Sequence, residues 1–222
     1  MLILIITMDI SRAKDILDYW FPNNGGADYD KWFMKSKDYD AEIKEKFGAL
    51  LKLAEEGKGM GWLVSKESFV AYIILLDQFS RHIYRGTKDS FKNDYASLLF
   101  VKQGFQIYGP VLEGYEFMFA FMPYMHTENE VLQLEGATIF DKYYKATQEL
   151  IYDHTTRLSS EDTIKLQEEW KMFQSMKPHL EGHLKCIQTF GRFPKRNEAL
   201  GRKSTQEEIE YMEQPEVKKR PY

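Results

Sequence analysis

One stretch of this 222-residue chain decides the fold: Leu75-Leu-Asp-Gln-Phe-Ser-Arg-His-Ile-Tyr-Arg-Gly-Thr87. It continues an apolar run and then places charged side chains at four-residue steps, at Asp77, Arg81 and Arg85. Residues four apart share one face of an α-helix. The stretch therefore predicts a mostly buried helix over residues 67–84 that carries a polar seam. Buried charges need partners of opposite sign, so carboxylates or a bound anion should face the two arginines.

The rest of the chain shows the apolar spacing of further helices. They are predicted over residues 9–21, 39–56, 88–107, 113–122, 130–152 and 163–190, with a short last helix that ends at Met212. Four residues are expected to cap the helices that follow them: Ser65, Thr87, Thr127 and Ser204. Pro123 is expected to lie beyond the end of its helix, and Pro178 to split or kink the longest one. No sustained alternation predicts a strand beyond the N-terminus.

The predicted helices come in successive pairs with short breaks, which indicates an all-α bundle or an array of helical hairpins. We expect an apolar N-terminal extension over residues 1–8, one helical domain over residues 9–213 and a polar C-terminal tail over residues 214–222. The apolar start is too short for a signal peptide or for a membrane span. The sequence is compatible with a translation start at Met1 or at Met8.

Composition excludes several classes of protein. Hydrophobic residues make up 43% of the chain and aromatic residues 15%, which is enough material for a large core. The net charge of -4 argues against broad nucleic-acid binding. The single cysteine, Cys186, excludes a disulfide framework and fits a reducing compartment. We therefore expect a soluble, cytoplasmic protein that binds neither nucleic acid nor membrane.

Most of the polar residues that could carry chemistry lie in four short stretches. The first is the polar seam, over residues 77–87, and the second covers residues 91–94. The third covers residues 123–128, and the fourth extends from His183 to Arg202. No phosphate-binding loop, dinucleotide fingerprint or nucleophile elbow accompanies them.

Together these stretches resemble the signature of a bacterial family known only as domain of unknown function 924, and the resemblance covers nearly the whole chain. The residues shared with the signature are Asp77, Gln78, Arg81, Arg85, Asp94, His126, Glu128, His183, Arg192, Arg196, Asn197 and Arg202. The resemblance implies an all-α fold of the tetratricopeptide-repeat type, an array of antiparallel helical hairpins in one domain. It implies no reaction, because no activity is attached to the family.

The chain departs from the family signature at five positions. Ser80 stands in place of proline, His82 of asparagine, Met125 of an acidic residue, Thr127 of serine and Lys195 of histidine. The changes at Met125 and Lys195 make the polar stretches more basic. They also weaken the case for proton transfer at those two positions.

Three functions fit the shared residues. Guanidinium groups bind carboxylates and phosphates through paired hydrogen bonds, so the first is a binding module whose pocket takes an anionic small molecule or a peptide carboxylate on the twelve shared residues. The second is a hydrolase or transferase acting on an anionic substrate, in which His126 or His183 moves a proton and Glu128 is a further catalytic candidate. The third is a structural scaffold in which acidic side chains neutralise the arginines.

His183 and Cys186 lie three residues apart on a predicted helix, a spacing that can present two zinc ligands. No other residues are spaced to complete such a site, so we expect no metal and no cofactor. The distant stretches 77–85 and 183–196 each hold arginines with few local acids. We therefore expect them to converge with His126 and Glu128 on one concavity. The ligand, any reaction and the oligomeric state stay open.

Overall fold

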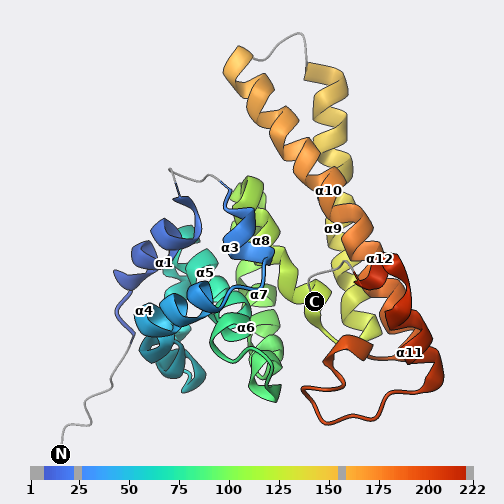
Figure 1. Ribbon diagram of the computed structural model, residues 1–222. Helices are drawn as coiled ribbons and strands as arrows, with labels where there is room; N and C mark the ends of the chain where they lie inside the picture. The colour runs from blue at the N-terminus through green and yellow to red at the C-terminus, as the bar shows by residue number, and fades with distance from the viewer. Residues whose placement is uncertain (1–7, 23–26, 155–158, 219–222) are drawn as a thin grey trace, which may run out of the picture. The chain divides into compact units, whose positions relative to one another are not determined.

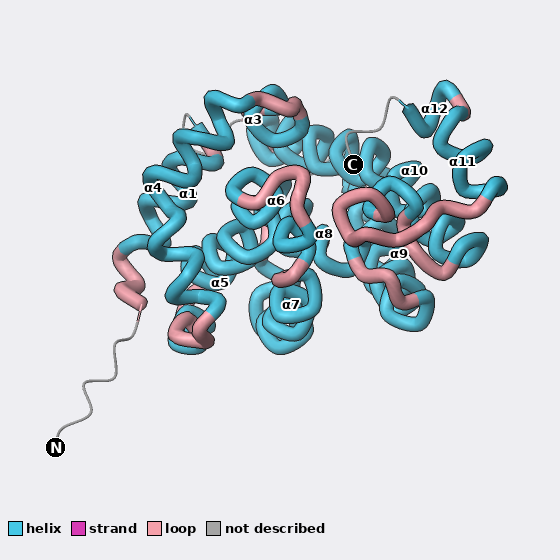
Figure 2. Tube along the Cα trace, turned by 60° about the horizontal axis from the view of Figure 1, so that its bottom comes forward, coloured by secondary structure: helices cyan, strands magenta, loops and turns pink. Residues whose placement is uncertain are grey.

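The computed structural model describes residues 8–22, 27–154 and 159–218, so the predicted extension over residues 1–8 lies outside this part except for Met8. The described residues form helices and loops without a strand, which confirms the all-α fold (Figure 2). They divide into two compact units: unit 1 comprises Met1–Val111 and Pro194–Tyr222, and unit 2 comprises Leu112–Phe193. One domain over residues 9–213 and a tetratricopeptide-like arrangement concern how the units join, and both stay predictions.

Unit 1 is built from two separate parts of the chain (Figure 1). Its first part contains α1 (Arg12–Trp20), α3 (Tyr29–Phe33), α4 (Lys37–Glu55), η1 (Met60–Val64), α5 (Lys66–Ile73), η2 (Ile74–Phe79), α6 (Ser80–Ile83), η3 (Lys88–Phe91), α7 (Asp94–Tyr108) and η4 (Gly109–Val111). Its second part contains η5 (Pro194–Arg196), α11 (Gln206–Glu213) and α12 (Pro215–Lys218). No helix of the described residues is both long enough and apolar enough to cross a membrane.

The core of unit 1 surrounds the continuous helical run α5–η2–α6, which corresponds to the predicted helix 67–84. Ser65 starts it, because its hydroxyl accepts the Ser68 N–H in a reciprocal capping box. Phe79 is fully buried in this run, 4.8 Å from the Phe47 ring of α4 and 5.4 Å from the Trp20 ring of α1. Aromatic packing of this kind contributes beyond the area that it buries.

The middle of this run is a π-helix, η2, which the apolar pattern does not predict. A π-turn closes its hydrogen bonds over five residues, so it inserts one extra residue and rotates the side chains that follow. Every residue of η2 is buried, including Asp77 and Gln78. The π-helix therefore holds part of the polar seam inside the core.

Unit 2 consists of α8 (Gly114–His126), α9 (Glu130–His154) and α10 (Ser160–Phe190). Helices α9 and α10 lie side by side as a long hairpin, as both views show (Figures 1 and 2). Helix α8 packs against the hairpin through Phe117, whose ring centre lies 4.9 Å from that of Phe173. Gly136 permits a close approach, since a Cβ there would lie 2.7 Å from the Cβ of Tyr124.

The expected helix over residues 88–107 begins later than predicted. Thr87 does not cap it: the Thr87 hydroxyl donates to the carbonyl of Tyr84, at 2.7 Å, and so closes the preceding helix instead. A short 3-10 helix, η3, follows, and α7 starts only at Asp94. The sequence shows a suitable hydroxyl at Thr87 but not which of two helix ends it serves.

Two other predicted caps are wrong by one or two residues. Asn129, rather than Thr127, caps α9, because the Leu132 N–H donates to Asn129 Oδ1 at 3.1 Å. Thr205, rather than Ser204, forms the capping box of α11, with Glu208 as its partner. At α11 two adjacent hydroxyl residues can serve as the cap, and backbone conformation selects between them.

Neither proline ends a helix. Pro123 lies inside α8, which continues to His126, and Pro178 does not split α10. Met176 and Leu180 on either side of Pro178 are buried, so side-chain packing holds α10 together there. The segment predicted as a polar tail contains α12, in which Val217 is buried.

Candidate functional site

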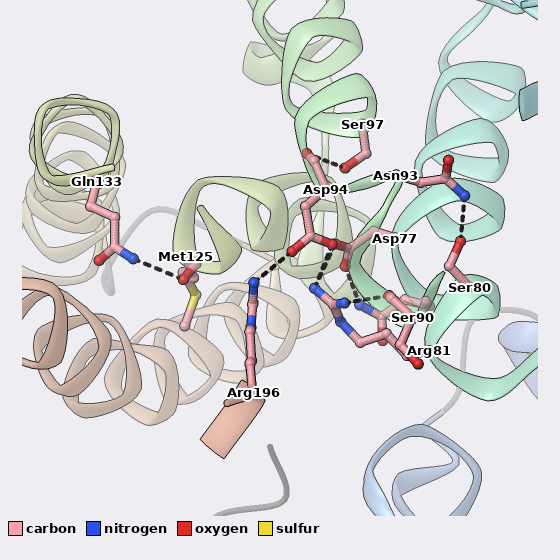
Figure 3. Close-up of polar contacts among 11 residues, drawn as sticks. Asp77, Ser80, Arg81, Ser90, Asn93, Asp94, Ser97, Met125, Gln133 and Arg196 are labelled. Atoms are coloured by element: carbon pink, nitrogen blue, oxygen red, sulfur yellow. Dashed lines mark hydrogen bonds and ion pairs between the residues drawn. The ribbon is translucent and has the colours of Figure 1, made fainter. Parts of the chain in front are cut away.

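The charged residues of unit 1 gather around Asp94, the first residue of α7 (Figure 3). Arg81 Nη2 lies 3.0 Å from Asp94 Oδ1, and Arg196 Nη1 donates to Asp94 Oδ2 at 2.9 Å. Arg81 comes from α6 and Arg196 from η5, so the two predicted arginine stretches meet at one carboxylate. We call Asp77, Arg81, Phe91, Asp94 and Arg196 the Asp94 cluster.

Phe91 completes the cluster on the side of η3. The Cζ atom of Arg81 lies 5.3 Å from its ring centre and that of Arg196 lies 4.5 Å away. Both distances suit a cation–π interaction. Arg81 Nη1 also donates to the carbonyl of Ser90, at 2.9 Å. The 3-10 helix that delays the start of α7 thus supplies two contacts to Arg81.

Asp77 is the fully buried member of the cluster. Gln78 Nε2 donates to Asp77 Oδ2 at 2.5 Å, and Arg81 Nη2 lies 3.5 Å from Asp77 Oδ1. Asp77 and Arg81, which the four-residue spacing places on one helical face, are therefore paired, although Asp94 is the nearer partner of Arg81. A buried carboxylate needs such positive and hydrogen-bonding neighbours to stay charged.

The Nη2 atom of Arg81 is an unusual donor. It is buried and lies near both carboxylates, yet no residue in the described part of the chain accepts a well-directed hydrogen bond from it. Burial by itself lowers the pKa of the Arg81 guanidinium, but attraction to Asp94 and Asp77 outweighs burial and raises it. The two carboxylates thus neutralise the charge of Arg81, but neither accepts a well-directed hydrogen bond from its Nη2 atom.

Arg85 belongs to a different cluster, in which Asp40 of α4 is the partner. Arg85 binds Asp40 with two hydrogen bonds, Nε to Oδ2 at 2.6 Å and Nη2 to Oδ1 at 2.8 Å. His82 Nδ1 lies 2.8 Å from the same Oδ1. Burial by itself raises the pKa of Asp40. The hydrogen bonds from Arg85 and His82 outweigh burial, so the pKa lies below its usual range. Sequence reasoning missed Asp40, because nothing marks it among the acidic residues of its helix.

Two further predicted residues organise the loop that follows Arg196. Asn197 is buried, and its Nδ2 donates to Glu208 Oε2 at 3.0 Å and to Ser204 Oγ at 3.1 Å. Arg202 Nε donates to Asn197 Oδ1 at 2.9 Å. These bonds join the loop to the first turn of α11 and so hold Arg196 near Asp94. The sequence analysis missed Glu208, because it placed the cap of α11 at Ser204, one residue before Thr205, whose capping box includes Glu208.

The predicted histidines are neighbours in unit 2. His126 ends α8 and His183 lies within α10, and their ring centres are 6.3 Å apart. Both side chains are buried. His183 Nδ1 lies 2.6 Å from the carbonyl oxygen of His179. A carbonyl oxygen can only accept, so Nδ1 of His183 carries a proton there.

The turn after α8 is held by Glu128 and Gln133. Glu128 Oε1 accepts the Phe193 N–H at 2.7 Å. Gln133, which is fully buried, donates from Nε2 to the carbonyl of Met125 at 3.1 Å (Figure 3). The same nitrogen donates to the carbonyl of Thr127 at 2.8 Å. The sequence analysis did not single out Gln133, because nothing in the helical pattern of α9 distinguishes it from the other polar residues of that helix. Both residues fix the backbone around His126.

Arg192 and Cys186 also lie in unit 2. Arg192 is half-buried, and its carbonyl accepts a weak bond from the buried Cys186 Sγ at 3.7 Å. Among the described residues, histidine, cysteine and carboxylate side chains form no group of three that could hold a metal ion. The predicted concavity combines residues of both units, so it stays a prediction, as does an anion-binding pocket.

Comparison with known proteins found one family and one solved structure, and both are described as of unknown function. The sequence pattern of the family described as "Bacterial protein of unknown function (DUF924)" matches residues 16–216. Among solved structures, the chain is similar to the protein of unknown function ATU0120 from Agrobacterium tumefaciens, with a TM-score of 0.68 and 27% identity. That similarity covers 91% of this chain and 97% of the other. None of the curated proteins matches this sequence.

Proposed function

The chain belongs to the bacterial DUF924 family, whose function is unknown, and we propose that it is a helical binding module for an anionic small molecule or a peptide carboxylate. The ligand would bind at the Asp94 cluster of unit 1. The observation that carries this proposal is the buried Nη2 donor of Arg81, which has no well-directed acceptor among the described residues. A cytoplasmic location belongs to the same proposal, because the single cysteine fits a reducing compartment.

Comparison with Arg85 gives this observation its weight. An arginine that only joins two helices can satisfy its donors with a two-pronged bond, as Arg85 does with Asp40. Arg81 instead contacts two carboxylates and one carbonyl from a single edge of the guanidinium group. A buried donor without an acceptor costs about 1–3 kcal/mol. A ligand oxygen placed at Nη2 would recover that cost.

Arg196 and Phe91 support the same site. Arg196 brings a second guanidinium group to the carboxylate that Arg81 contacts, and Phe91 fixes both by packing against them. Planar guanidinium groups in fixed positions favour carboxylate and phosphate ligands. The two arginines are balanced by Asp77 and Asp94, so binding would depend on directed hydrogen bonds rather than on net charge.

The test is the melting temperature of the full chain in the presence of acetate, inorganic phosphate or a short peptide with a free carboxylate. At least one of these anions should raise it at constant ionic strength. Arg81→Lys should abolish the rise, because lysine keeps the charge but loses the planar donor edge. Arg85→Lys is the matched control and should keep the rise. An equal rise in both variants, or none in the wild type, would contradict the proposal.

A structural scaffold is the second candidate, and the charge balance of the Asp94 cluster favours it. In a scaffold the ion pairs would only fix how α6, α7 and η5 dock. Buried ion pairs can serve this purpose without adding stability over apolar packing. The same experiment separates the two candidates, since a scaffold responds to none of the anions.

A hydrolase or transferase is the third candidate. Its support is the bond between His183 Nδ1 and the carbonyl of His179, which fixes the imidazole ring next to His126. Catalytic histidines are commonly oriented through one ring nitrogen in this manner. An enzyme would turn over an anionic ester or phosphoester, and His183→Gln would stop turnover without lowering the melting temperature.

A further inference from the structure

The carboxylate of Asp94 lies directly between the two guanidinium groups to which the proposed function assigns an anion. Its two oxygens are 3.0 Å from Arg81 Nη2 and 2.9 Å from Arg196 Nη1. All three side chains are largely buried, with exposed fractions of 13% for Asp94, 20% for Arg81 and 12% for Arg196. A ligand that reaches these arginines therefore also reaches Asp94.

This position of Asp94 restricts the chemistry of the ligand. An oxygen that accepts a hydrogen bond from Arg81 Nη2 must lie about 3 Å from it, and so within a few ångströms of the Asp94 carboxylate. A second acidic group, the fully buried Asp77, lies 3.5 Å from the same nitrogen. A bare carboxylate or sulfate would bring only negative charge and lone pairs towards these two side chains.

A ligand with a hydroxyl group beside its charge avoids this repulsion. The anionic oxygen can accept from the guanidinium group, while the hydroxyl donates to Asp94. A carboxylate that accepts a hydrogen bond from a hydroxyl forms one of the stronger bonds available in proteins. The Asp94 carboxylate, which repels a bare anion, would then select a hydroxylated one.

Resting on the proposed function, we infer that the ligand is an anion with an O–H donor next to its charge, and that Asp94 is the residue that selects it. Two small-molecule sources share this chemistry: an α-hydroxy carboxylate, and phosphate or a phosphate monoester that retains one proton. The second pKa of a phosphate monoester is about 6. The form that retains one proton, and so has the O–H donor, therefore predominates in slightly acidic solution.

The experiment is calorimetric titration of the full chain at pH 6 with two matched pairs of anions. Lactate against propionate tests the hydroxy-acid source, and inorganic phosphate against sulfate tests the phosphate source. In the pair that represents the ligand class, the hydroxylated member should bind at least tenfold more tightly. Asp94→Asn should remove most of this preference, because an amide can donate to a bare anion. Asp40→Asn, in the neighbouring Arg85 cluster, should leave the preference intact.

The outcomes separate this inference from the function on which it rests. If neither member of either pair binds the wild type, this inference fails, whereas the proposed function fails only if the peptide carboxylate also leaves the melting temperature unchanged. If the members of each pair bind equally well, anion binding stands and the selection by Asp94 is overturned. A preference that persists in Asp94→Asn overturns it as well. If that variant does not fold, as judged by circular dichroism, Asp94→Glu replaces it and should change the affinity of the hydroxylated member more than that of the bare one.

Discussion

Arg81 lies in α6 and Arg85 in the turn that follows it, four residues later, yet they contact carboxylates from different helices. Arg81 reaches Asp94 of α7 and the buried Asp77, whereas Arg85 forms a two-pronged bond with Asp40 of α4. The exposed fraction of the side chain is 20% for Arg81 and 33% for Arg85. Solvent screens the ion pair of Arg85 more strongly. Removing Arg81 should therefore cost more stability than removing Arg85.

Arg81→Ala should lower the free energy of unfolding by about 3–5 kcal/mol, because it removes a positive partner from the fully buried Asp77. Arg85→Ala, the control, should cost about 1 kcal/mol or less. Urea titration followed by circular dichroism measures both values. A loss for Arg81→Ala no larger than that of the control would mean that the ion pairs of Arg81 contribute little to folding.

His82 should make stability depend on pH. Burial is the main cause that lowers its pKa from 6.5 to about 4 in the folded protein, assisted by the charge of Arg85. Because the unfolded chain binds this proton more readily, the contribution is fully present above pH 6.5 and disappears as the pH falls through about 4. The total change can reach about 3 kcal/mol.

His82→Asn provides the measurement, since asparagine can still hydrogen-bond to Asp40 but does not titrate. The difference between the free energies of unfolding at pH 7 and pH 4.5 should be smaller in the variant than in the wild type. Urea titrations at the two pH values give this difference. Identical differences would show that His82 is not the group that titrates.

At the scale of the helices, glycines decide how closely neighbours approach. Gly104 of α7 faces α5, where a Cβ would lie 2.2 Å from Cε2 of Phe69. Gly48 of α4 has only Lys44 nearby, at 3.8 Å. The two positions thus form a matched pair, one in a crowded helix contact and one in an open position.

Gly104→Ala should cost about 1–3 kcal/mol, because the added methyl group forces Phe69 out of its place. Gly48→Ala should be neutral or stabilise the chain by up to about 1 kcal/mol, since alanine favours a helix more than glycine does. Melting temperatures of the two variants test the pair. Similar values for both would contradict the close packing of α5 on α7.

At the scale of the whole molecule, unit 1 is discontinuous, because residues after 193 return to it. They contribute Arg196, which donates to Asp94 at 2.9 Å and packs on the Phe91 ring, both in the first part of unit 1. The first part of unit 1 should therefore be less stable without them.

Ending the chain after Phe193 should lower the melting temperature of unit 1 by more than about 5 °C, which corresponds to about 1–2 kcal/mol. Trp20, Trp32 and Trp62 lie in unit 1 and Trp170 in unit 2. Tryptophan fluorescence in a Trp170→Phe background thus reports on unit 1 alone. The full-length Trp170→Phe chain is the control, and equal melting temperatures would show that the returning segment adds no stability.

The sequence by itself determined the elements whose causes are local. Apolar spacing predicted the helices, Ser65 predicted the start of the central one, and four-residue spacing placed Asp77 and Arg81 on one helical face. The resemblance carried by the motifs identified the family. Each of these depends on residues within one or two helical turns of one another, or on the residues of the motifs themselves.

Only the tertiary structure decided the partners that are distant in the chain. Asp40 for Arg85, and Asp94 for Arg196 over 102 residues, depend on the path of the backbone between them. The choice of Thr205 over Ser204 as a cap depends on the loop held by Asn197. The π-helix η2, which places Asp77 and Gln78 in the core, has no local pattern that distinguishes it from an α-helix. Many chain paths satisfy the same local preferences, and packing selects the one in which the buried charges meet.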